Sequence, residues 1–269
     1  MQYDPIKRYL GNIFNKTTFF RLLFYKILDV ILLRTWHIRK EMRTIKKLLP
    51  QNAQILDGGS GFGQYDYYLS TLSRNWNILA VDIKTEQVED CNNFFAKLGL
   101  SKRVTFIEAD LTKYVEPVKY DMILSVDVME HILEDITVFK NFNNSLKPGG
   151  VLLISTPSDQ GGSDVNLDED SSFIEEHVRD GYNLIEIEEK LFATGFTKVE
   201  ARYSYGVPGK ISWKLSMKYP ILMVNTNKIF LVLLPFYFIV VLTFALILNF
   251  LDTRFIHKTG TGLIVKAWK

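Results

Sequence analysis

The sequence predicts an α/β fold with a doubly wound, Rossmann-like central sheet, on three observations. A short apolar run at Ile55 and Leu56 breaks directly into a glycine-rich turn. From residue 54 to residue 155, strand-length apolar runs alternate with helix-length segments. Two of the later runs end in aspartates, Asp82 and Asp110. Because parallel strands bring their carboxyl ends to one edge of the sheet, we expect a ligand at that edge.

The turn has the form Asp-x-Gly-x-Gly-x-Gly, with Asp57, Gly59, Gly61 and Gly63 at the named positions. Glycines allow a sharp turn and a close approach of the backbone to a ligand at the start of a helix. The dinucleotide fingerprint Gly-x-Gly-x-x-Gly does not fit, because its third glycine would fall on Gln64. The turn therefore indicates a nucleotide-like cofactor, and an ordinary strand-to-helix turn is the alternative.

The second strand, residues 77–81, ends in Asp82, about twenty residues beyond the turn. From there a carboxylate can accept hydrogen bonds from both hydroxyls of a ribose. The third strand, residues 104–109, ends in Asp110 and Leu111. An aspartate at a strand end also commonly caps the following turn, which is the alternative interpretation of Asp110.

The fourth strand, residues 120–126, leads into Asp-Val-Met-Glu-His-Ile at 127–132, and Lys-Pro-Gly-Gly then leads into a fifth strand at 151–155. Together with the glycine turn and the two aspartates, these segments resemble the class I S-adenosylmethionine-dependent methyltransferases, including the quinone O-methyltransferases. The resemblance implies a seven-stranded sheet and S-adenosyl-L-methionine as the cofactor. That cofactor has no phosphates, which agrees with the spacing of the turn.

The resemblance also assigns roles to residues. Asp57 serves the amino acid end of the cofactor, Asp82 its ribose and Asp110 its adenine amino group. The implied cofactor-binding residues are Asp57, Gly59, Gly61, Gly63, Asp82, Ile83, Asp110, Leu111 and Val126.

The sulfonium methyl group is already activated, so its transfer chiefly requires an aligned acceptor. A base helps only where the acceptor must lose a proton, and His131 and His177 are the candidate catalytic residues. Arg179 and Tyr182 are candidates for positioning the substrate, because their segment resembles a lid over the acceptor site. For His131 a structural hydrogen bond is the alternative. Residues 156–172, rich in Ser, Gly and Asp, predict a loop over the acceptor pocket.

Asp127, Glu130 and His131 are spaced i, i+3 and i+4, which suggests a metal site as one interpretation. In a helix these three side chains would share one face and offer oxygen and nitrogen ligands. A solvated helix start is the preferred interpretation, so no metal is predicted.

Residues 17–36 predict an apolar helix, and residues 34–49 predict a second helix with six basic residues against Glu41. This basic face is either solvated or directed at anionic lipid headgroups. The formal net charge of +2 does not suggest a polyanion partner, so no nucleic acid partner is predicted. The single cysteine, Cys91, excludes an internal disulfide and favours a reducing compartment.

The sixth and seventh strands are predicted at residues 196–205 and 261–268, and the short hairpin that usually joins them is replaced by an insertion. Its first part repeats lysine every fourth residue until Pro220 interrupts it. Residues 229–251 carry no charge and as a helix would extend about 35 Å, enough to span a bilayer. Both ends must lie on one side for the seventh strand to join the sheet, which predicts a re-entrant hairpin broken near Pro235.

The predicted organisation is N-terminal helices at 1–50, a cofactor-binding domain at 51–205, a membrane-associated insertion at 206–258 and the last strand at 259–269. We expect a monotopic enzyme on the cytoplasmic face of a membrane, with the lipid surface as a partner. Its methyl acceptor would be a hydrophobic small molecule or lipid: a quinone precursor, an isoprenoid or sterol-like compound, or a lipid headgroup. A buried cap or a homodimer interface is the alternative for the insertion. The alternative functions are a scaffold or regulatory subunit with this fold, and an RNA methyltransferase.

Overall fold

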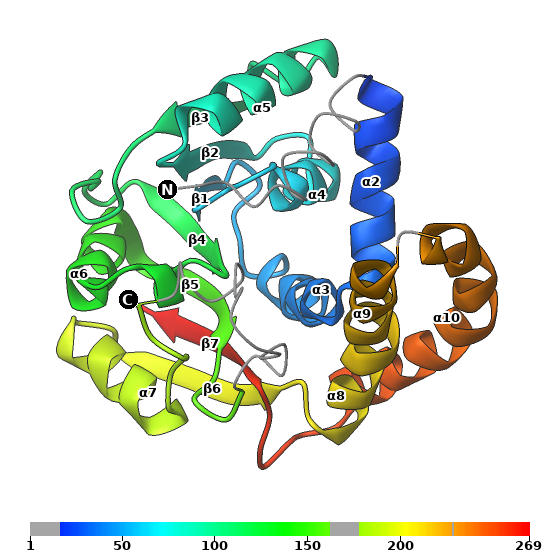
Figure 1. Ribbon diagram of the computed structural model, residues 1–269. Coiled ribbons are helices and arrows are strands. Elements are labelled where there is room, and N and C mark those ends of the chain that lie inside the picture. The colour runs from blue at the N-terminus through cyan, green and yellow to red at the C-terminus, as the bar shows by residue number, and fades with distance from the viewer. Residues whose placement is uncertain (1–16, 162–177, 228) are drawn as a thin grey trace.

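A computed structural model of the chain describes residues 17–161, 178–227 and 229–269 (Figure 1). Its sheet has seven strands in the order β3-β2-β1-β4-β5-β7-β6. Strands β1 to β5 run parallel to their neighbours in that group, and β7 is antiparallel to both β5 and β6. The predicted fold class is confirmed. The strands are β1 (Gln54–Gly58), β2 (Asn77–Asp82), β3 (Val104–Glu108), β4 (Tyr120–Val126), β5 (Leu146–Pro157), β6 (Lys198–Ser204) and β7 (Gly262–Trp268).

Helices cover both faces of the sheet and divide the core into two clusters (Figure 1). Because side chains alternate along a strand, Ile55 of β1 packs in one cluster and Leu56 in the other. Helices α2, α3, α4 and α5 contribute to the first cluster, and α6 and α7 to the second. These helices are α2 (Thr18–Ile31), α3 (Leu33–Ile45), α4 (Gln64–Leu72), α5 (Thr85–Lys97), α6 (Asp135–Ser145) and α7 (Leu184–Ala193).

The two N-terminal helices meet at Leu32, which has an extended conformation. The predicted boundary near residues 34–36 was therefore wrong by a few residues. Strand β5 also begins earlier than predicted, because Leu146 pairs with Tyr120 of β4. The register then shifts, and pairing resumes at Val151 opposite Met122. Of the predicted loop at 156–172, residues 162–172 lie outside the described part of the chain.

The insertion forms a helical hairpin between β6 and β7. One arm is α8 (Val207–Trp213), a π-helical turn η2 (Lys214–Lys218) and α9 (Tyr219–Thr226), and the other arm is α10 (Phe230–Arg254). The hairpin turns at Asn227, which has an extended conformation. We call residues 207–254 the helical hairpin.

Neither proline breaks its helix, so both predicted interruptions were wrong. Pro220 stands at the start of α9, where a missing N–H is tolerated. The π-helical turn before it keeps the chain helical, because the Tyr219 N–H bonds to the Lys214 carbonyl five residues back. Pro235 lies in the second turn of α10 and removes one backbone hydrogen bond without ending the helix.

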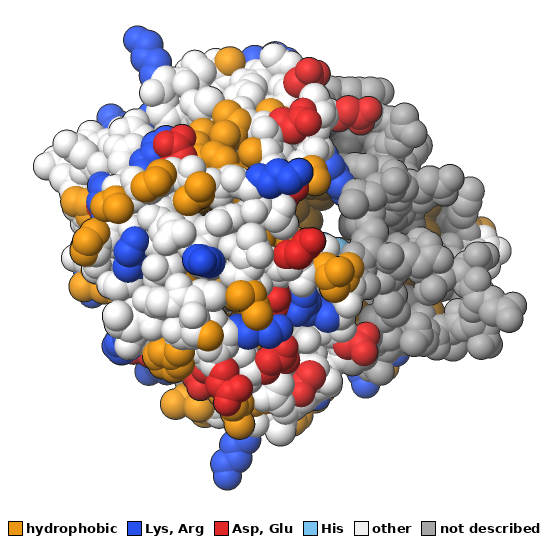
Figure 2. All heavy atoms as spheres, turned by 90° about the vertical axis from the view of Figure 1, so that its left-hand side faces the viewer, with side chains coloured by type: hydrophobic (Ala, Val, Ile, Leu, Met, Phe, Trp, Pro, Cys, Tyr) orange, Lys and Arg blue, Asp and Glu red, His pale blue; other side chains and the backbone are white. Residues whose placement is uncertain are grey.

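Helix α10 is long and apolar enough to cross a membrane, the one such helix among the described residues, and 6% of its most apolar window is buried. Its exposed apolar side chains include Leu231, Val232, Phe236, Ile239, Val240, Phe244, Ile247 and Phe250. Helix α2 exposes Phe19, Phe20, Leu23, Ile27 and Val30. On the face seen in Figure 2, basic and acidic side chains are instead interspersed with small apolar patches. Large apolar exposure is thus concentrated on the hairpin and α2.

Candidate active site

The glycine corner, residues 57–63, turns β1 into α4 through three glycines with positive φ. These are Gly59 at 91°, Gly61 at 52° and Gly63 at 73°. A Cβ on Gly59 would lie 2.1 Å from the Val128 side chain, so this position has no room for one. A Cβ on Gly61 would meet nothing within 4 Å. Gly61 therefore presents bare backbone to open space, as a ligand-binding turn requires.

The end of β2 holds the corner in place. The Val81 carbonyl accepts hydrogen bonds from the N–H groups of Gly59 (2.8 Å) and Ser60 (3.1 Å). One oxygen of Asp82 accepts from the Gly61 N–H at 2.8 Å, and the other accepts from the Lys84 N–H at 3.0 Å. Ile83 is 58% exposed beside this carboxylate, where a flat base could pack on it. The ribose and adenine contacts of Asp82 and Ile83 stay predictions.

Two buried carboxyl groups lie beneath the corner, Asp57 on β1 and Asp66 on α4. Burial raises the pKa of Asp57 to about 7 and raises that of Asp66 well above its ordinary value, and neither carboxyl oxygen of Asp66 has a hydrogen-bond partner among the described residues. Among the described residues, Asp57 Oδ2 and Ser60 Oγ have no hydrogen-bond partner. Such orphaned acceptors fit the positively charged amino acid end of S-adenosylmethionine. Asp66 escaped the sequence interpretation because a carboxylate in the first turn of a helix is an ordinary capping residue.

Asp110 caps the turn after β3. It accepts from the Thr112 N–H at 2.9 Å and the Thr112 hydroxyl at 2.7 Å, and these bonds hold the pKa of the carboxyl below its ordinary value. Leu111 and Val126 are both buried, Leu111 in the cluster that contains Phe142. The structure thus agrees with the turn-capping role of Asp110. Contact of Asp110 with adenine, and contact of Leu111 and Val126 with the cofactor, stay predictions.

Helix α2 closes over the corner from outside, which the sequence did not reveal. The buried side chains of Arg21 and Tyr25 both donate to the Phe62 carbonyl in the corner, Arg21 at 2.9 Å. Arg21 also contacts the Tyr25 hydroxyl (2.9 Å) and Cys91 Sγ (3.0 Å). The available signal was an arginine that directly follows Phe19 and Phe20 and precedes Leu22 and Leu23, because a charge within such an apolar run requires partners when it is buried.

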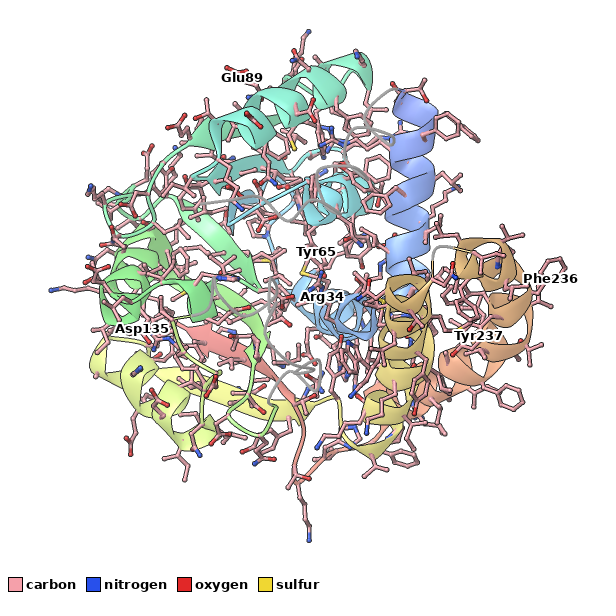
Figure 3. All side chains as sticks on the ribbon, viewed as in Figure 1. Arg34, Tyr65, Glu89, Asp135, Phe236 and Tyr237 are labelled. Atoms are coloured by element: carbon pink, nitrogen blue, oxygen red, sulfur yellow. The ribbon has the colours of Figure 1, made fainter. Side chains whose placement is uncertain are left out.

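The predicted acceptor side of the site is the region beyond β4, next to the topological switch between β1 and β4. Asp127 follows β4 with φ 52°, and its carboxylate contacts Nη1 of Arg34 from α3. Tyr65 of α4 lies beside them, with its hydroxyl 3.4 Å from Thr35 Oγ1. Figure 3 shows Arg34 and Tyr65 close together near the centre of the molecule.

The alternative metal site does not form as the spacing suggested. Residues 129–131 are a short 3-10 helix and Asp127 precedes it, so the three side chains do not share an α-helical face. Asp127 contacts Arg34, and buried Glu130 accepts from the Thr156 hydroxyl at 3.1 Å. Across the described residues, no group of three His, Cys, Asp or Glu side chains could hold a metal ion. His131 is exposed just after β4, and its role as a base stays a prediction.

The predicted substrate-positioning pair lies in a buried cluster around Asp135. Arg179 donates to Asp135 at 2.6 Å and to the Ile132 carbonyl at 2.7 Å. The Tyr182 hydroxyl donates to Asp135 at 2.8 Å, and its side chain is fully buried. These bonds tie the segment after residue 177 to the end of η1 (Met129–His131) and to α6. Substrate contact by Arg179 and Tyr182 stays a prediction, and His177 lies outside the described residues.

The basic side chains of α3 and the turn after it divide into two groups, because Arg43, Lys46 and Lys47 are exposed while Arg39 and Lys40 contact neighbouring helices. Arg39 contacts Asp29 of α2, and Lys40 donates to the Thr253 carbonyl of α10. His37 is fully buried and bonds through Nε2 to Asp252 of α10 at 2.8 Å. Asp252 also accepts from the N–H groups of Tyr205 and Gly209 at 3.1 and 2.9 Å. The second predicted helix is therefore the anchor of the helical hairpin.

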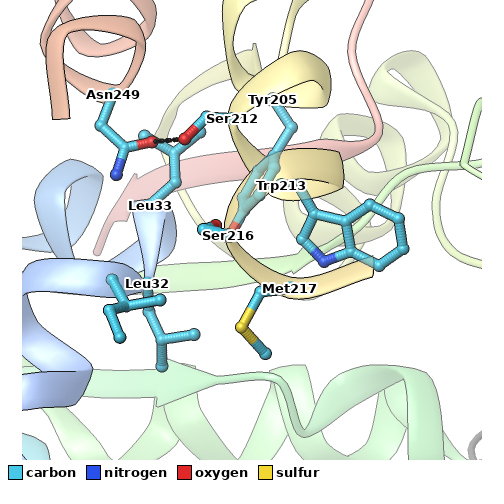
Figure 4. Close-up of a pocket in the computed structure, with 9 residues that line it drawn as sticks. Leu32, Leu33, Tyr205, Ser212, Trp213, Ser216, Met217 and Asn249 are labelled. Carbon is cyan, nitrogen blue, oxygen red and sulfur yellow. Dashed lines mark hydrogen bonds between the residues drawn. The ribbon is translucent and has the colours of Figure 1, made fainter. Parts of the chain in front are cut away.

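A small hollow of about 10 Å³, room for roughly one water molecule, lies where α2, α3 and the hairpin meet (Figure 4). Its lining includes Leu32, Leu33, Tyr205, Trp213, Met217 and Asn249. We call it the junction pocket. The Tyr205 hydroxyl accepts from the Arg34 N–H at 3.1 Å, so the pocket adjoins the Arg34–Asp127 pair.

The fold and the corner agree with what comparison with known proteins shows. The profile of a methyltransferase domain family matches residues 49–201, more than half of the chain. The chain belongs to this family. That match confirms the predicted family and, with it, S-adenosylmethionine as the cofactor.

Several curated methyltransferases match part of the chain. Phosphoethanolamine N-methyltransferase 1 of Arabidopsis thaliana is 30% identical over 170 residues, 58% of this chain and 31% of that protein. The ubiquinone biosynthesis O-methyltransferase of Rickettsia prowazekii is 29% identical over 119 residues, 44% of each chain. A malonyl-[acyl-carrier protein] O-methyltransferase of Ilyobacter polytropus is 31% identical over 102 residues, 38% of each chain. The matches thus span less than half the length of these relatives.

Solved structures share the fold. Phosphoethanolamine N-methyltransferase 2 of Haemonchus contortus, in complex with phosphomonomethylethanolamine and S-adenosylhomocysteine, has a TM-score of 0.58 at 22% identity, covering 86% of this chain and 52% of that one. The [4+2]-cyclase SpnF has a TM-score of 0.58 at 17% identity, covering 86% of this chain and 80% of that one. At such identities the likeness concerns the fold alone.

Proposed function

We propose that this protein transfers a methyl group from S-adenosylmethionine to a hydrophobic acceptor that it takes from the cytoplasmic leaflet of a membrane. The observation that carries the proposal is the contrast between the two sides of α10. Its outer side is a continuous apolar surface, and its C-terminal end is fixed through Asp252 to His37 of α3 and to the Gly209 N–H at the start of the hairpin. An apolar surface of this extent favours an interaction with lipid or protein.

The cofactor supplies an electrophilic methyl group, so the demands on the chain are modest. The glycine corner and Asp57 would hold its amino acid end, and Asp82 its ribose. The remaining task is to hold an acceptor near the end of β4 and to exclude water. His131, which follows β4, would accept a proton where the acceptor is a hydroxyl or an amine.

The path of the chain supports a monotopic arrangement. The helical hairpin leaves the sheet after β6 and returns to it at β7, so both of its ends lie at the catalytic domain. The apolar faces of α10 and α2 belong to neighbouring helices that contact each other. Insertion of such faces into the interfacial region of a bilayer gains stability in proportion to the apolar area removed from water.

The test combines membrane binding with transfer of label. Purified protein, membranes and methyl-labelled S-adenosylmethionine are incubated, and lipids, RNA and protein are separated. We expect label in the lipid extract. Label confined to RNA or protein contradicts the proposal.

A matched pair of variants tests the surface. Ile239→Glu with Phe244→Glu places charge on the outer side of α10, and Ile185→Glu with Phe192→Glu does the same on exposed apolar positions of α7. We expect the α10 variant to lose at least roughly 100-fold in vesicle partitioning, since each buried apolar side chain is worth about 1.5–3 kcal/mol. The α7 variant should float with vesicles as the unmodified protein does.

A further inference from the structure

We infer that cofactor binding is coupled to the release of a proton from Asp57, and that Asp66 acts as a positioning residue by keeping its own proton and donating a hydrogen bond to Asp57. We call these two residues the carboxyl pair. On binding, the O–H bond of the Asp57 carboxyl group breaks and the proton passes to solvent. The resulting carboxylate balances the positive charge of the cofactor's ammonium group. The coupling rests on the predicted role of Asp57 at the amino acid end of the cofactor, and the identity of the methyl acceptor does not enter it.

The first argument is a shortage of hydrogen-bond donors. Both members of the carboxyl pair are buried, with 1% of Asp57 and 0% of Asp66 exposed. Both carboxyl oxygens of Asp66 and Oδ2 of Asp57 have no hydrogen-bond partner among the described residues. A buried ionised carboxylate without donors is unfavourable, so such a group keeps its proton. A protonated Asp66 has an O–H group of its own, and the neighbouring Asp57 is the acceptor with which it interacts.

The second argument is the charge around the carboxyl pair. Burial raises the pKa of Asp57 to about 7, and the interaction with Asp66 acts in the opposite direction. The negative charge of Asp82 on β2 raises the pKa of both members. Arg21 of α2 hydrogen-bonds to two groups that also face the pair. Three such groups keep their protons at neutral pH, because burial raises the pKa of each: Tyr25 of α2, Tyr65 of α4 and Cys91 of α5. Burial and Asp82 thus favour the protonated form of Asp57 until a cation binds.

The third argument is position. The carboxyl pair lies beneath the glycine corner, where the backbones of Gly59 and Gly61 are partly exposed. A Cβ on Gly61 would meet nothing within 4 Å, so a ligand can approach the backbone there. A positive charge bound at this surface acts on the pair through the intervening backbone, and the low dielectric constant of the interior strengthens the interaction. Direct contact between the ligand and Asp66 is not required.

Coupling to a proton fixes how affinity changes with pH. Where the free protein holds a proton that the complex has lost, affinity rises with pH and becomes constant once the free protein has lost the proton as well. S-adenosylhomocysteine has the same amino acid end as the cofactor. We therefore expect its affinity to increase roughly five- to tenfold between pH 6 and pH 8. A carboxyl pair that served the fold alone would leave the affinity equal at the two pH values.

The experiment counts the protons by calorimetry at pH 6.5 in buffers of different ionisation enthalpy. We expect about 0.5 to 1 proton released for each S-adenosylhomocysteine bound. The nucleoside 5′-methylthioadenosine lacks the amino acid part and should bind without release. Asp57→Asn should abolish release, and Glu89→Gln, exposed on α5, should leave it unchanged (Figure 3). Absence of release in the unmodified protein, or equal release with 5′-methylthioadenosine, overturns the coupling.

Two substitutions at Asp66 test its role as a donor. Asp66→Asn keeps an N–H group toward Asp57 and should bind S-adenosylhomocysteine within about twofold of the unmodified protein. Asp66→Leu removes the donor, so the pKa of Asp57 should rise by about one unit. Affinity should then fall roughly tenfold at pH 6.5 and only about twofold at pH 8.

A purely structural role of Asp66 would give a different pattern. Equal losses at both pH values in Asp66→Leu, or equal losses in Asp66→Asn and Asp66→Leu, would overturn the assignment of Asp66. Circular dichroism of each variant confirms that it is folded. These measurements need binding and no turnover, so a failure to find label in lipids would remove the proposed acceptor and leave the proton coupling standing.

Discussion

The glycine corner and the helical hairpin are built in opposite ways. The corner consists of consecutive residues whose backbone conformation makes the site, and its bonds to β2 arise from the regular pairing of neighbouring strands. The hairpin is placed by side chains that are remote in sequence, such as His37 and Asp252, which are 215 residues apart. The first depends on the absence of side-chain atoms and the second on buried polar groups that satisfy one another. Substitutions should therefore act on them in different ways.

The largest expected effect is at the corner. Gly59→Ala forces a Cβ against Val128 at a positive φ, which should lower the free energy of unfolding by roughly 3–5 kcal/mol. Gly61→Ala is the matched control, because its Cβ meets only open space and should cost about 1 kcal/mol of strain. Urea unfolding measures both, and equal losses would contradict the geometry of the corner. Binding of S-adenosylhomocysteine should fall in both variants.

The hairpin should respond to loss of its buried anchor. Asp252→Ala leaves His37 and the Gly209 N–H without an acceptor and should destabilise the hairpin by roughly 3 kcal/mol. Hydrogen exchange should show faster exchange across residues 207–254, with affinity for S-adenosylhomocysteine unchanged within about twofold. Arg254→Ala, exposed at the same end of α10, is the control. Loss of cofactor affinity as well would mean that the corner and the hairpin are not independent.

The buried Asp57 should give the corner a pH dependence opposite in sign to that of the hairpin anchor, where burial lowers the pKa of His37 and the bond from His37 lowers the pKa of Asp252. Burial raises its pKa to about 7, so the folded protein keeps a proton that the unfolded chain releases near pH 4. The contribution of Asp57 to the free energy of unfolding is fully present below about pH 4 and is lost as the pH rises toward 7. Asp57→Asn should therefore raise the free energy of unfolding of the cofactor-free protein at pH 8 by about 1–3 kcal/mol, and by less at pH 5.

Unfolding in urea at both pH values measures this difference. Asp110→Asn serves as the contrast, since hydrogen bonds from Thr112 lower the pKa of Asp110 and its contribution has the opposite sign. The stability that Asp110 contributes is present at neutral pH and lost on acidification. Asp57→Asn should also weaken cofactor binding, because the neutral amide no longer attracts the ammonium group. A variant that binds the cofactor as well as the unmodified protein would remove Asp57 from the site.

The smallest expected effect tests whether the glycine corner depends on support from α2. Tyr25→Phe removes one of the two side-chain bonds from α2 to the Phe62 carbonyl. A neutral hydrogen bond is worth about 1 kcal/mol, so affinity for S-adenosylhomocysteine should fall roughly fivefold. Tyr67→Phe, whose ring lies 5.8 Å from that of Tyr25, should have no such effect. Unchanged affinity in Tyr25→Phe would show that the corner needs no support from α2.

The sequence was sufficient where structure follows from neighbouring residues. The alternation of strands and helices, the turn at Gly59 to Gly63 and the strand-end positions of Asp82 and Asp110 all follow from spacing and alternation. It was insufficient where partners are remote. Arg34 looked like one of several basic residues on a helix face, and nothing local indicated that it would meet Asp127. Pro220 was misjudged because the widened turn before it depends on packing between the two arms of the hairpin.

Strand β7 lies between β5 and β6, and this placement imposes an order of events on the nascent chain. A polypeptide emerges from the ribosome N-terminus first, so β6 and all of α10 are exposed before the strand that joins them to the sheet has been made. During that interval β6 lacks a pairing partner. The apolar helix α10 also lacks its anchor, because the N–H groups of Tyr205 and Gly209 bond to Asp252 only when α10 folds back. The speed of translation past residue 254 thus sets how long the chain is open to association with other nascent chains.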